Sequence, residues 1–504
     1  MSLTETITIP QVGFTYNLPI GLFINNEYVA SADGKKIDTI NPSTGEKITS
    51  FYAASEKDVD KAVKAARNAY ENVWSKMPAE ERGFLLYKLA DLIERDKSKL
   101  AALETLDAGK PYHSNALNDL DQIIQLTRYF AGSADKYTKG QNIPLTHDKY
   151  ALTFKVPYGV VGQVVPWNYP LAMASWKIQG CLAAGNTIVI KPAENTSISL
   201  LYMAQLFVEA GFPPGVLNVI PGLGSVAGTA LASHQDVDKI AFTGSTQVGQ
   251  KIMELAGKSN LKAVTLECGG KSPAVVFDDA KLNNAVEWVA NGIYYNSGQN
   301  CTANSRIYVQ ETIYDEFLAK FRTYIKDNWT FGDKLDPFDE KCTLGPVISE
   351  AQYKKIRAYL DHGANEEKLN SEKLSEFPTK SKGYFIPPTF FTDVPSSSKL
   401  SQEEIFGPAA VIAKFRDYDE AIKLANNTNY GLASAVFSEN IRTTNKFVRD
   451  IKAGTVWVNS SNDEEISVPF GGFKMSGVGR ELGESGVDAY TQLKSAHINL
   501  ADYN

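Results

Sequence analysis

The amino-acid sequence predicts a mixed α/β protein with a doubly wound parallel sheet, a second α/β domain and a small β element. Its 504 residues are 43% hydrophobic and 22% charged, which is ordinary for globular proteins and excludes disordered, collagen-like and coiled-coil chains. At roughly 100–200 residues per domain, this length corresponds to two to four domains. Short β-rich runs alternate with helical stretches, and repeated strand–helix units indicate parallel sheets.

The N-terminal part contains a helix that we expect to cover a core. Ser55 followed by Asp58 resembles a capping box, which satisfies free backbone N–H groups at a helix start. Apolar side chains then recur at helical spacing, at Val59, Ala62, Val63, Ala66 and Tyr70. The pattern predicts a surface helix with one buried face.

Two series of short β-rich runs predict the two sheets. The first sheet takes its strands from Val160–Val165, Thr187–Ile190, Val216–Ile220, Lys239–Thr243 and Ala263–Leu266. The rhythm resumes after Gly270 and predicts a second α/β domain with strands at Ala274–Phe277, Arg306–Gln310, Pro408–Phe415 and Thr455–Asn459. Outside both series, Asn142–Pro157 and Thr491–Leu500 are interpreted as a bridging hairpin and a terminal strand that could pair between subunits.

Charge and apolar patterning argue against nucleic acid and membranes as partners. The chain has 51 Lys and Arg against 58 Asp and Glu, a net charge of −7, and no long run of like charges. No stretch approaches the ~18 consecutive apolar residues of a membrane span. The first arginine is Arg67, whereas mitochondrial transit peptides are rich in arginine, so we expect a cytoplasmic protein.

The cysteines and histidines show no ligand spacing. The four cysteines, Cys181, Cys268, Cys301 and Cys342, form no CxxC pair, and the five histidines pair with no other His or Cys. We therefore expect reduced thiols, one of which could be reactive, and no metal site.

Two glycine-containing segments are candidates for binding a dinucleotide. Gly222-Leu-Gly224 with Gly228 resembles the dinucleotide fingerprint with one residue too many, and a simple turn is the alternative. In Phe242–Gly249, a strand ends at Gly244 and Ser245 opens a helix, whose free N–H groups and partial positive charge suit a pyrophosphate. A serine-capped helix after a tight turn is the alternative there.

An acidic residue lies beyond a strand of the first sheet. Lys191-Pro192-Ala193-Glu194 follows Thr187–Ile190, at the carboxyl edge where doubly wound sheets bind ligands. A carboxylate at Glu194 can bind ribose hydroxyls and would repel a 2′-phosphate, which favours NAD over NADP. A solvated loop charge is the alternative.

Three polar side chains are candidates for catalysis. Cys301 lies in a polar segment, Ser297–Arg306, which makes access to the thiol plausible, although most free cysteines are buried and inert. Glu267 ends a strand beside Gly269-Gly270 and is a candidate general base, an exposed glutamate being the alternative. Asn168, between Pro166 and Pro170, could donate to a developing oxyanion or could simply form a turn.

Taken together, these segments resemble the aldehyde dehydrogenase superfamily from about Gly21 to Leu500, and most closely its cytosolic fungal members, with features shared by members that oxidise aminoaldehydes. The motifs that carry the resemblance are Pro166–Pro170, Lys191–Glu194, Phe242–Gly249, Leu266–Pro273, Gly298–Cys301, Glu404–Pro408 and Pro469–Gly477.

The resemblance implies a covalent mechanism. Cys301 matches the nucleophile that forms a thiohemiacetal with the aldehyde, and Asn168 with the backbone N–H of Cys301 matches the oxyanion hole. Hydride transfer to a nicotinamide leaves a thioester, and Glu267 matches the base that activates water for its hydrolysis to a carboxylate. Lys177 and Glu481 match accessory polar residues that could relay protons.

The resemblance also implies a cofactor site and a domain plan. Lys191 and Glu194 match ribose contacts, Ser245 a pyrophosphate contact, and Glu404 with Phe406 the nicotinamide ribose and ring. Further expected NAD contacts are Val165, Pro166, Trp167, Gly224, Phe242, Gly244, Gly249, Leu266 and Gly269. The expected domains are a Rossmann-like NAD-binding domain (1–136 and 158–267), a catalytic domain (268–477) and a bridging or oligomerisation element (137–157 and 478–504), assembled into a homodimer or homotetramer.

One position departs from the pattern of the family. Cys268 stands where many relatives carry leucine after the catalytic glutamate, and we interpret it as a small packing residue. A redox role is the alternative.

The loop from Asn459 to Phe470 indicates the substrate. Asp463, Glu464 and Glu465 at a tunnel mouth would attract a cationic tail, since a charge pair at 4 Å is worth about 4 kcal/mol at an effective dielectric near 20 and about 1 in water. The expected tunnel residues are Tyr169, Met173, Trp176, Tyr295 and Phe470, with Asn300 and Thr302 beside the nucleophile. We therefore expect an ω-aminoaldehyde such as 3-aminopropanal; if the acids merely face solvent, the substrate is a small aliphatic aldehyde such as acetaldehyde.

Two other functions compete with this interpretation. A CoA-acylating dehydrogenase would use the same cysteine but pass the acyl group to CoA, and the presence of Glu267 argues against it. A non-catalytic structural relative would tolerate loss of the nucleophile or the base, and both Cys301 and Glu267 are present.

Overall fold

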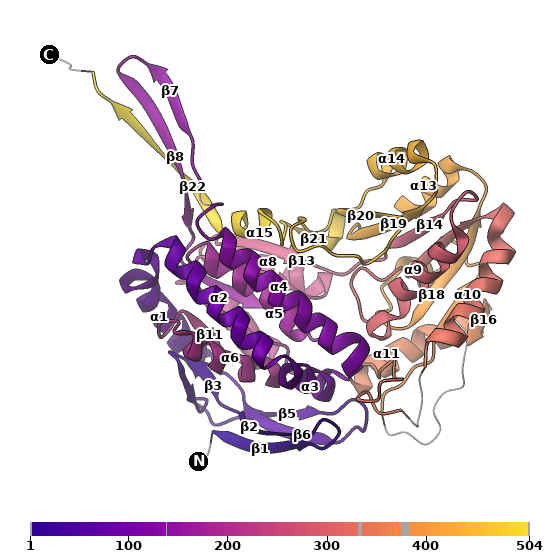
Figure 1. Ribbon diagram of the computed structural model, residues 1–504, viewed down its shortest axis with the longest axis horizontal. Coiled ribbons are helices and arrows are strands. Elements are labelled where there is room, and N and C mark those ends of the chain that lie inside the picture. The colour runs from indigo at the N-terminus through magenta and orange to yellow at the C-terminus, as the bar shows by residue number, and fades with distance from the viewer. Residues whose placement is uncertain (1–2, 138, 331–334, 368, 374–382, 502–504) are drawn as a thin grey trace.

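The chain folds into two α/β lobes and a β arm that projects from the first lobe (Figure 1). The computed structural model describes residues 3–137, 139–330, 335–367, 369–373 and 383–501. Small antiparallel hairpins at the N-terminus, β1–β2 (Thr4–Ile9, Phe14–Pro19) and β5–β6 (Lys36–Ile40, Lys47–Tyr52), lie along the base of the first lobe.

The first lobe contains an eight-stranded sheet in the order β21-β13-β12-β9-β10-β11-β3-β4. The strands from β13 to β11 are parallel, and the antiparallel strands lie at the two edges. Of the parallel strands, β9 comes first in the chain; β10 and β11 follow on one side of it and β12 and β13 on the other, so the strand order reverses between β9 and β12. Ligands of such sheets bind outside the carboxyl ends of the strands at this reversal. The bounds are β3 Leu22–Ile24, β4 Glu27–Val29, β9 Val160–Val164, β10 Thr187–Lys191, β11 Leu217–Val219, β12 Lys239–Thr243, β13 Ala263–Glu267 and β21 Gly477–Val478.

Helices cover both faces of this sheet, because successive side chains of a strand point to opposite faces. Val161 and Ile188 pack in one apolar cluster, whereas Val160 and Val189 pack in another. The first cluster is covered by α2 (Ala79–Arg95), α3 (Lys97–Ala108), α4 (Leu117–Ser133), α5 (Pro170–Ala183) and α6 (Ile198–Ala210). The second is covered by α1 (Glu56–Asn72), α7 (Thr229–Ser233) and α8 (Thr246–Ser259).

The second lobe contains a seven-stranded sheet in the order β16-β17-β18-β15-β14-β19-β20, parallel except for the pair β16–β17. Its strands are β14 Pro273–Val276, β15 Arg306–Gln310, β16 Asn370–Lys373, β17 Thr389–Thr392, β18 Ala409–Phe415, β19 Ala433–Phe437 and β20 Thr455–Val458. Its helices are α9 Leu282–Tyr294, α10 Tyr314–Asn328, α11 Glu350–Asp361, α12 Lys399–Gln402, α13 Tyr418–Asn426 and α14 Ile441–Asp450.

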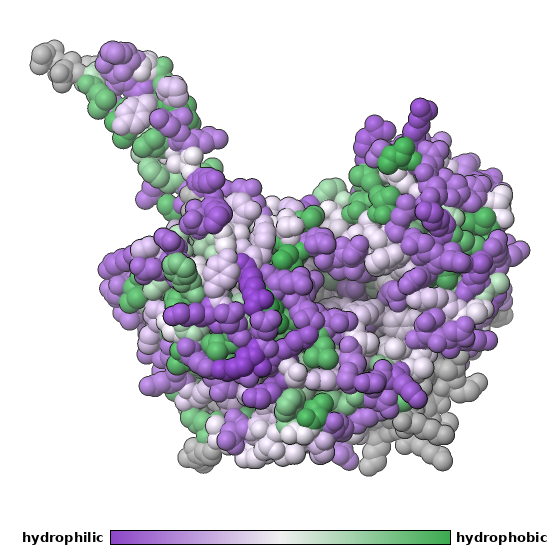
Figure 2. All heavy atoms as spheres, viewed as in Figure 1, coloured by the Kyte–Doolittle hydropathy of each residue, from purple (hydrophilic) through white to green (hydrophobic). Residues whose placement is uncertain are grey.

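The arm is a three-stranded antiparallel sheet formed by β7 (Asn142–Thr146), β8 (Lys149–Pro157) and β22 (Thr491–Asn499). The two segments interpreted as a bridging hairpin and a terminal strand therefore pair with each other within one chain. The stretch just before β22 returns to the first lobe, since β21 pairs with β13 and the short helix α15 (Ser485–Asp488) packs on α5. Figure 2 shows hydrophobic residues exposed along the arm.

The predicted elements agree with the observed ones to within a residue or two. The capping box at Ser55 and Asp58 starts α1, whose buried face is built on Val59, Val63 and Ala66, although Ala69 is buried in place of Tyr70. Strands β17 and β19 are absent from the prediction. Within the described part of the chain, no helix has the length and apolarity that crossing a bilayer requires.

Candidate active site

Two cavities meet at Cys301, between the carboxyl edge of the first sheet and the amino edge of the second. One cavity, of about 700 Å³, is lined by residues that follow β9, β12 and β13, and the other, of about 920 Å³, lies against α4 and α5. Cys301 and Met173 line both. A group bound in either cavity therefore reaches the same sulfur atom.

The nucleophile candidate lies on a strained turn. Asn296, Ser297 and Gly298 have φ of 52°, 58° and 69°, a left-handed conformation that non-glycine residues adopt at a cost. Hydrogen bonds hold the turn, including one of 2.7 Å from Ser297 Oγ to the carbonyl of Gly345. Gly270 also approaches closely, because a Cβ at this position would clash with the carbonyl oxygen of Cys301. The turn leaves the Cys301 side chain partly exposed.

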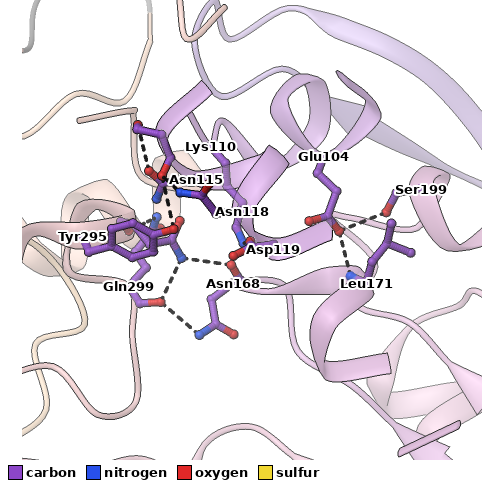
Figure 3. Close-up of polar contacts among 12 residues, drawn as sticks. Glu104, Lys110, Asn115, Asn118, Asp119, Asn168, Leu171, Ser199, Tyr295 and Gln299 are labelled. Carbon is purple, nitrogen blue, oxygen red and sulfur yellow. Dashed lines mark hydrogen bonds and ion pairs between the residues drawn. The ribbon is translucent and has the colours of Figure 1, made fainter. Parts of the chain in front are cut away.

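The amide of Asn168 faces the nucleophile turn (Figure 3). Its Nδ2 donates a 2.9 Å hydrogen bond to the backbone carbonyl of Gln299, and the backbone carbonyl of Asn168 accepts a 2.9 Å bond from Asn296 Nδ2. An asparagine amide carries two N–H donors, so one remains for an oxyanion on a group bound to Cys301. Asn168 is buried, which strengthens such a bond.

Glu267 is a buried carboxyl group beside the thiol. Its side chain is 4% exposed, and within the described residues neither oxygen has a hydrogen-bond partner. Burial, and then the charge of Glu481, raise the pKa of Glu267 to about 8, while Lys177 and the interaction with Cys301 lower it. Burial and the neighbouring Glu267 carboxylate raise the pKa of the Cys301 thiol well above its usual value. A pKa of about 8 leaves only part of the Glu267 population ionised at neutral pH, and the ionised form is the one that can act as a general base.

Lys177 and Glu481 form a buried ion pair behind this base and line neither cavity. The Lys177 side chain is fully buried and that of Glu481 is 10% exposed. They act on Glu267 through their charges, as its pKa shows. A direct proton relay through the pair stays a prediction.

The first cavity is lined by several of the residues predicted to bind a dinucleotide. Ser245 caps the N-terminus of α8 at its edge, accepting a 3.4 Å bond from the backbone of Val248, and this helix end suits a phosphate. Glu404 Oε1 accepts a 2.8 Å bond from the backbone of Gly270, and a Cβ at Gly269 would clash with its carboxylate. The predicted cofactor residues that line the cavity are Pro166, Trp167, Gly244, Ser245, Gly269, Glu404 and Phe406.

The other predicted cofactor residues lie behind or beyond this cavity. Lys191 is buried, and its Nζ donates 2.8 Å bonds to the carbonyls of Pro192 and Gly222 and lies 3.4 Å from Glu194. Gly224 faces open space, where a Cβ would meet nothing within 4 Å. The buried residues are Val165, Phe242, Gly249 and Leu266. Cys268 is buried in the same apolar cluster as Phe242, in agreement with a packing role.

The second cavity contains all nine residues predicted for the substrate pocket: Tyr169, Met173, Trp176, Tyr295, Asn300, Thr302, Asp463, Glu464 and Phe470. The rings of Trp176 and Phe470 pack edge to face with centroids 5.2 Å apart. Glu465, the third residue of the acid run, does not line the cavity. Only Asp463 and Glu464 of the acid run therefore face the cavity.

Sequence reasoning missed several cavity residues. Asp119 and Asn118, on α4, line the substrate cavity, and Gln352 and Lys355, on α11, line the cofactor cavity. These side chains lie on helices, where a polar residue at one position of the repeat predicts only a solvated face. No signal in the sequence distinguishes them.

Comparisons with known proteins agree with this geometry. Residues 28–496 match the aldehyde dehydrogenase family. The chain is 65% identical over 501 residues to aldehyde dehydrogenase NAD(P)+ 1 of Saccharomyces cerevisiae, covering 99% of each protein, and 63% identical to aldehyde dehydrogenase NAD(P)+ 2 of the same yeast, with the same coverage.

Solved structures show the same fold. The NAD+ complex of an aldehyde dehydrogenase from Bacillus cereus superposes with a TM-score of 0.91 at 44% identity, covering 96% of this chain and 97% of that one. An indole-3-acetaldehyde dehydrogenase of P. syringae superposes with a TM-score of 0.93 at 37% identity over the same shares. The predicted fold class and the expectation of an aldehyde-oxidising enzyme with a nicotinamide cofactor are thereby confirmed at the level of the family. From its sequence, its fold and the meeting of two cavities at Cys301, the chain belongs to the aldehyde dehydrogenase family.

Proposed function

We propose that the protein oxidises an aldehyde to its carboxylic acid with NAD, through a thioester on Cys301. The observation that carries this proposal is the position of Cys301 at the junction of the two cavities, with Glu267 and Asn168 beside it. Overall, the aldehyde, water and NAD+ give the carboxylic acid, NADH and a proton. NAD, when bound, supplies the acceptor for the hydride.

In the proposed reaction, Cys301, Asn168 and Glu267 have distinct roles. Cys301 Sγ adds to the carbonyl carbon as the partly exposed thiol gives its proton to solvent water, and the free N–H of the Asn168 amide stabilises the alkoxide. Loss of hydride leaves the thioester. Glu267 then takes a proton from water, and the resulting hydroxide attacks the thioester carbon, releasing the acid and the Cys301 thiolate.

NAD is proposed over NADP because of Glu194. Its side chain is 41% exposed beside the buried Lys191, which places a carboxylate beside the predicted position of the adenosine ribose. The carboxylate can accept hydrogen bonds from the ribose hydroxyls, and it repels the charge of a 2′-phosphate.

The proposed substrate is an ω-aminoaldehyde such as 3-aminopropanal. Asp463 and Glu464 line the substrate cavity together with Asp119, whose carboxylate is already ion-paired with the buried Lys110, and the described residues that line the cavity include no Lys, Arg or His. Burial, and then the charges of Asp463 and Asp119, raise the pKa of Glu464 to about 7, and a cationic tail would keep this side chain ionised. The ring of Tyr169 already carries the Lys110 ammonium 3.9 Å from its centroid, whereas the other aromatic walls, such as Trp176, can favour an ammonium group of the substrate. Small aliphatic aldehydes such as acetaldehyde are the alternative.

The test compares kcat/KM for 3-aminopropanal and propanal. Replacing Glu464 by Gln should lower the ratio roughly tenfold, since a charge contact of this kind lies between the values for water and for a protein surface. Glu465→Gln is the matched control, because Glu465 belongs to the same acid run but lies outside the cavity, and it should leave the ratio unchanged. Equal ratios in the parent and Glu464→Gln would reject the aminoaldehyde proposal and favour small aliphatic aldehydes.

Release of the acid distinguishes hydrolysis from transfer to CoA. With any short aldehyde, we expect multiple turnovers of NADH formation in the absence of CoA, because Glu267 is placed to activate water. A requirement for CoA would instead indicate the acylating enzyme.

We also propose a cytoplasmic homodimer or homotetramer. The four cysteines are unpaired, as in a reducing compartment. The outer edges of β7 and β22 in the arm are unpaired within the described chain, and free strand edges pair readily with another chain.

A further inference from the structure

Helix α3 carries a buried carboxylate that the proposed chemistry does not use. Glu104 is 0% exposed and lines neither of the two cavities at Cys301. A buried carboxylate is costly unless hydrogen bonds compensate for the lost water. The hydrogen-bond partners of Glu104 therefore indicate which segment its side chain holds in place.

Glu104 caps a helix that begins in the active site. Its Oε1 accepts a 2.7 Å hydrogen bond from the backbone N–H of Leu171 and lies 3.5 Å from Ser199 Oγ (Figure 3). Leu171 is the second residue of α5, and the N-cap residue of that helix, Tyr169, makes no side-chain cap. Glu104 thus does from α3 what an N-cap side chain usually does from its own helix.

The capped end of α5 directly follows the oxyanion residue. Asn168 precedes the helix by two residues, and Pro170 restricts the backbone between them. On the opposite side, Asn168 is hydrogen-bonded to Asn296 and Gln299 of the nucleophile turn, at 2.9 Å each. The segment is therefore held at two points, one on the nucleophile turn and one on Glu104.

We propose that Glu104 is a positioning residue, which fixes the start of α5 and thereby aims the Asn168 amide at the oxyanion formed on Cys301. The inference rests on the proposed oxyanion role of Asn168. Glu104 touches neither cavity, so its effect on the reaction passes through the backbone from Leu171 to Asn168.

The two possible roles of Glu104, as a helix cap or as a residue that only fills space, predict different effects of its substitution on the rate. An apolar side chain of similar size can replace a buried charge without loss of stability, so a carboxylate that only filled space would tolerate Glu104→Leu without loss of rate. Leucine cannot accept the Leu171 N–H, whereas the amide oxygen of Glu104→Gln still can, although more weakly than a carboxylate.

The measurement is the single-turnover rate of NADH formation at saturating NAD and aldehyde, with thermal unfolding followed in parallel. We expect Glu104→Leu to slow this step roughly tenfold, because a small misplacement of a catalytic group is costly, and Glu104→Gln to slow it about threefold. Thr105→Val is the control. Thr105 is 1% exposed on α3, and among the described residues its hydroxyl has no hydrogen-bond partner, so this control should keep the parent rate.

A double-mutant cycle with Asn168→Ala tests whether Glu104 acts on the reaction through Asn168. Asn168→Ala alone should slow NADH formation by about 10²–10³, the loss seen when one oxyanion donor is removed. Added to it, Glu104→Leu or Glu104→Gln should slow the step by no more than about twofold, since residues that act through one another are not additive. Two results would overturn the positioning role of Glu104: full additivity of the effects of the Glu104 and Asn168 substitutions on the rate, or a rate in Glu104→Leu equal to that of the parent protein. A parent rate in Asn168→Ala overturns the proposed role of Asn168 itself and, with it, the inference.

Discussion

Burial raises the pKa of both Glu267 and Cys301, and the Glu267 carboxylate raises the pKa of the Cys301 thiol further, so neither ionises easily at neutral pH. The arrangement keeps a negative charge from forming in the site before substrate arrives. It also makes the base strong when it is needed, because a carboxylate with a pKa of about 8 accepts a proton more readily than one with the usual value near 4.5. Burial thus keeps Glu267 and Cys301 largely protonated at neutral pH.

Hydrolysis of the thioester should therefore depend on pH. Glu267 acts as a base only when ionised, so the steady-state kcat should rise as pH increases through about 8. In Glu267→Gln, the first turnover of NADH should persist while the steady-state rate falls by about 10²–10⁴ and loses this rise. Stopped-flow and steady-state NADH absorbance across pH check both effects, and an unchanged steady-state rate would contradict the role of Glu267.

At the scale of residues, the sequence predicts the reacting groups better than the groups that support them. Cys301, Glu267 and Asn168 stand at strand ends or in polar turns beside glycine or proline, where a functional side chain has a local signal. Asp119 and Glu104 lie within helices, and what surrounds them is decided by tertiary packing. Glu404 and Phe406 were predicted only through the resemblance, because nothing in their local pattern indicates a ligand.

At the scale of elements, the arm exposes apolar side chains on a narrow sheet. Leu493 is 73% exposed, Leu145 is 50% and Phe154 is 42%. A three-stranded sheet with little core of its own gains stability by packing against another surface. This supports the proposed role of the arm in assembly.

Replacing Leu493 by Asp should weaken that assembly. We expect a lower mass in sedimentation or size-exclusion chromatography, because a charge would be buried in the apolar contact. The control is Ile441→Asp, which changes a side chain that is 68% exposed on α14, in the lobe remote from the arm (Figure 1). An unchanged mass in Leu493→Asp at every concentration would exclude the arm from the interface.

The elements themselves were largely predictable. Strands such as Lys239–Thr243 and Arg306–Gln310 are short apolar runs between turn signals, and their observed bounds equal the predicted ones. Strand β19 was missed, although Ala433–Phe437 is fully buried, because small residues weaken its β signal. The pairing of β22 with β8 could not be predicted, since it joins segments that lie more than half the chain apart.

At the scale of the whole molecule, the two sheets present opposite edges to the site. The first lobe contributes residues at or just beyond the carboxyl ends of its strands, such as Glu267 and Asn168, and the second contributes residues that precede its strands, such as Cys301 and Glu404. Composition and strand rhythm predict two such lobes. Which edges face one another depends on the interface between them and is not encoded in any local pattern.

The overall acidity of the molecule should favour capture of a cationic substrate. With a net charge of −7 and exposed Asp463 near the cavity, kcat/KM for 3-aminopropanal should fall roughly threefold as salt shortens the Debye length from about 30 Å to about 3 Å. The value for propanal should stay constant, which makes it the internal control. Equal salt dependence for both aldehydes would contradict electrostatic attraction.

The meeting of the two cavities at Cys301 has a consequence for how ligands enter and leave the site. Each cavity includes an exposed side chain, Lys355 in one and Asp463 in the other, so each reaches the outside independently. Under the proposed function, the nucleotide and the aldehyde would enter through different cavities that meet at Cys301. Under the proposed function, the reduced nucleotide could therefore leave while the acyl group is still attached to Cys301, and water could then enter the vacated cavity.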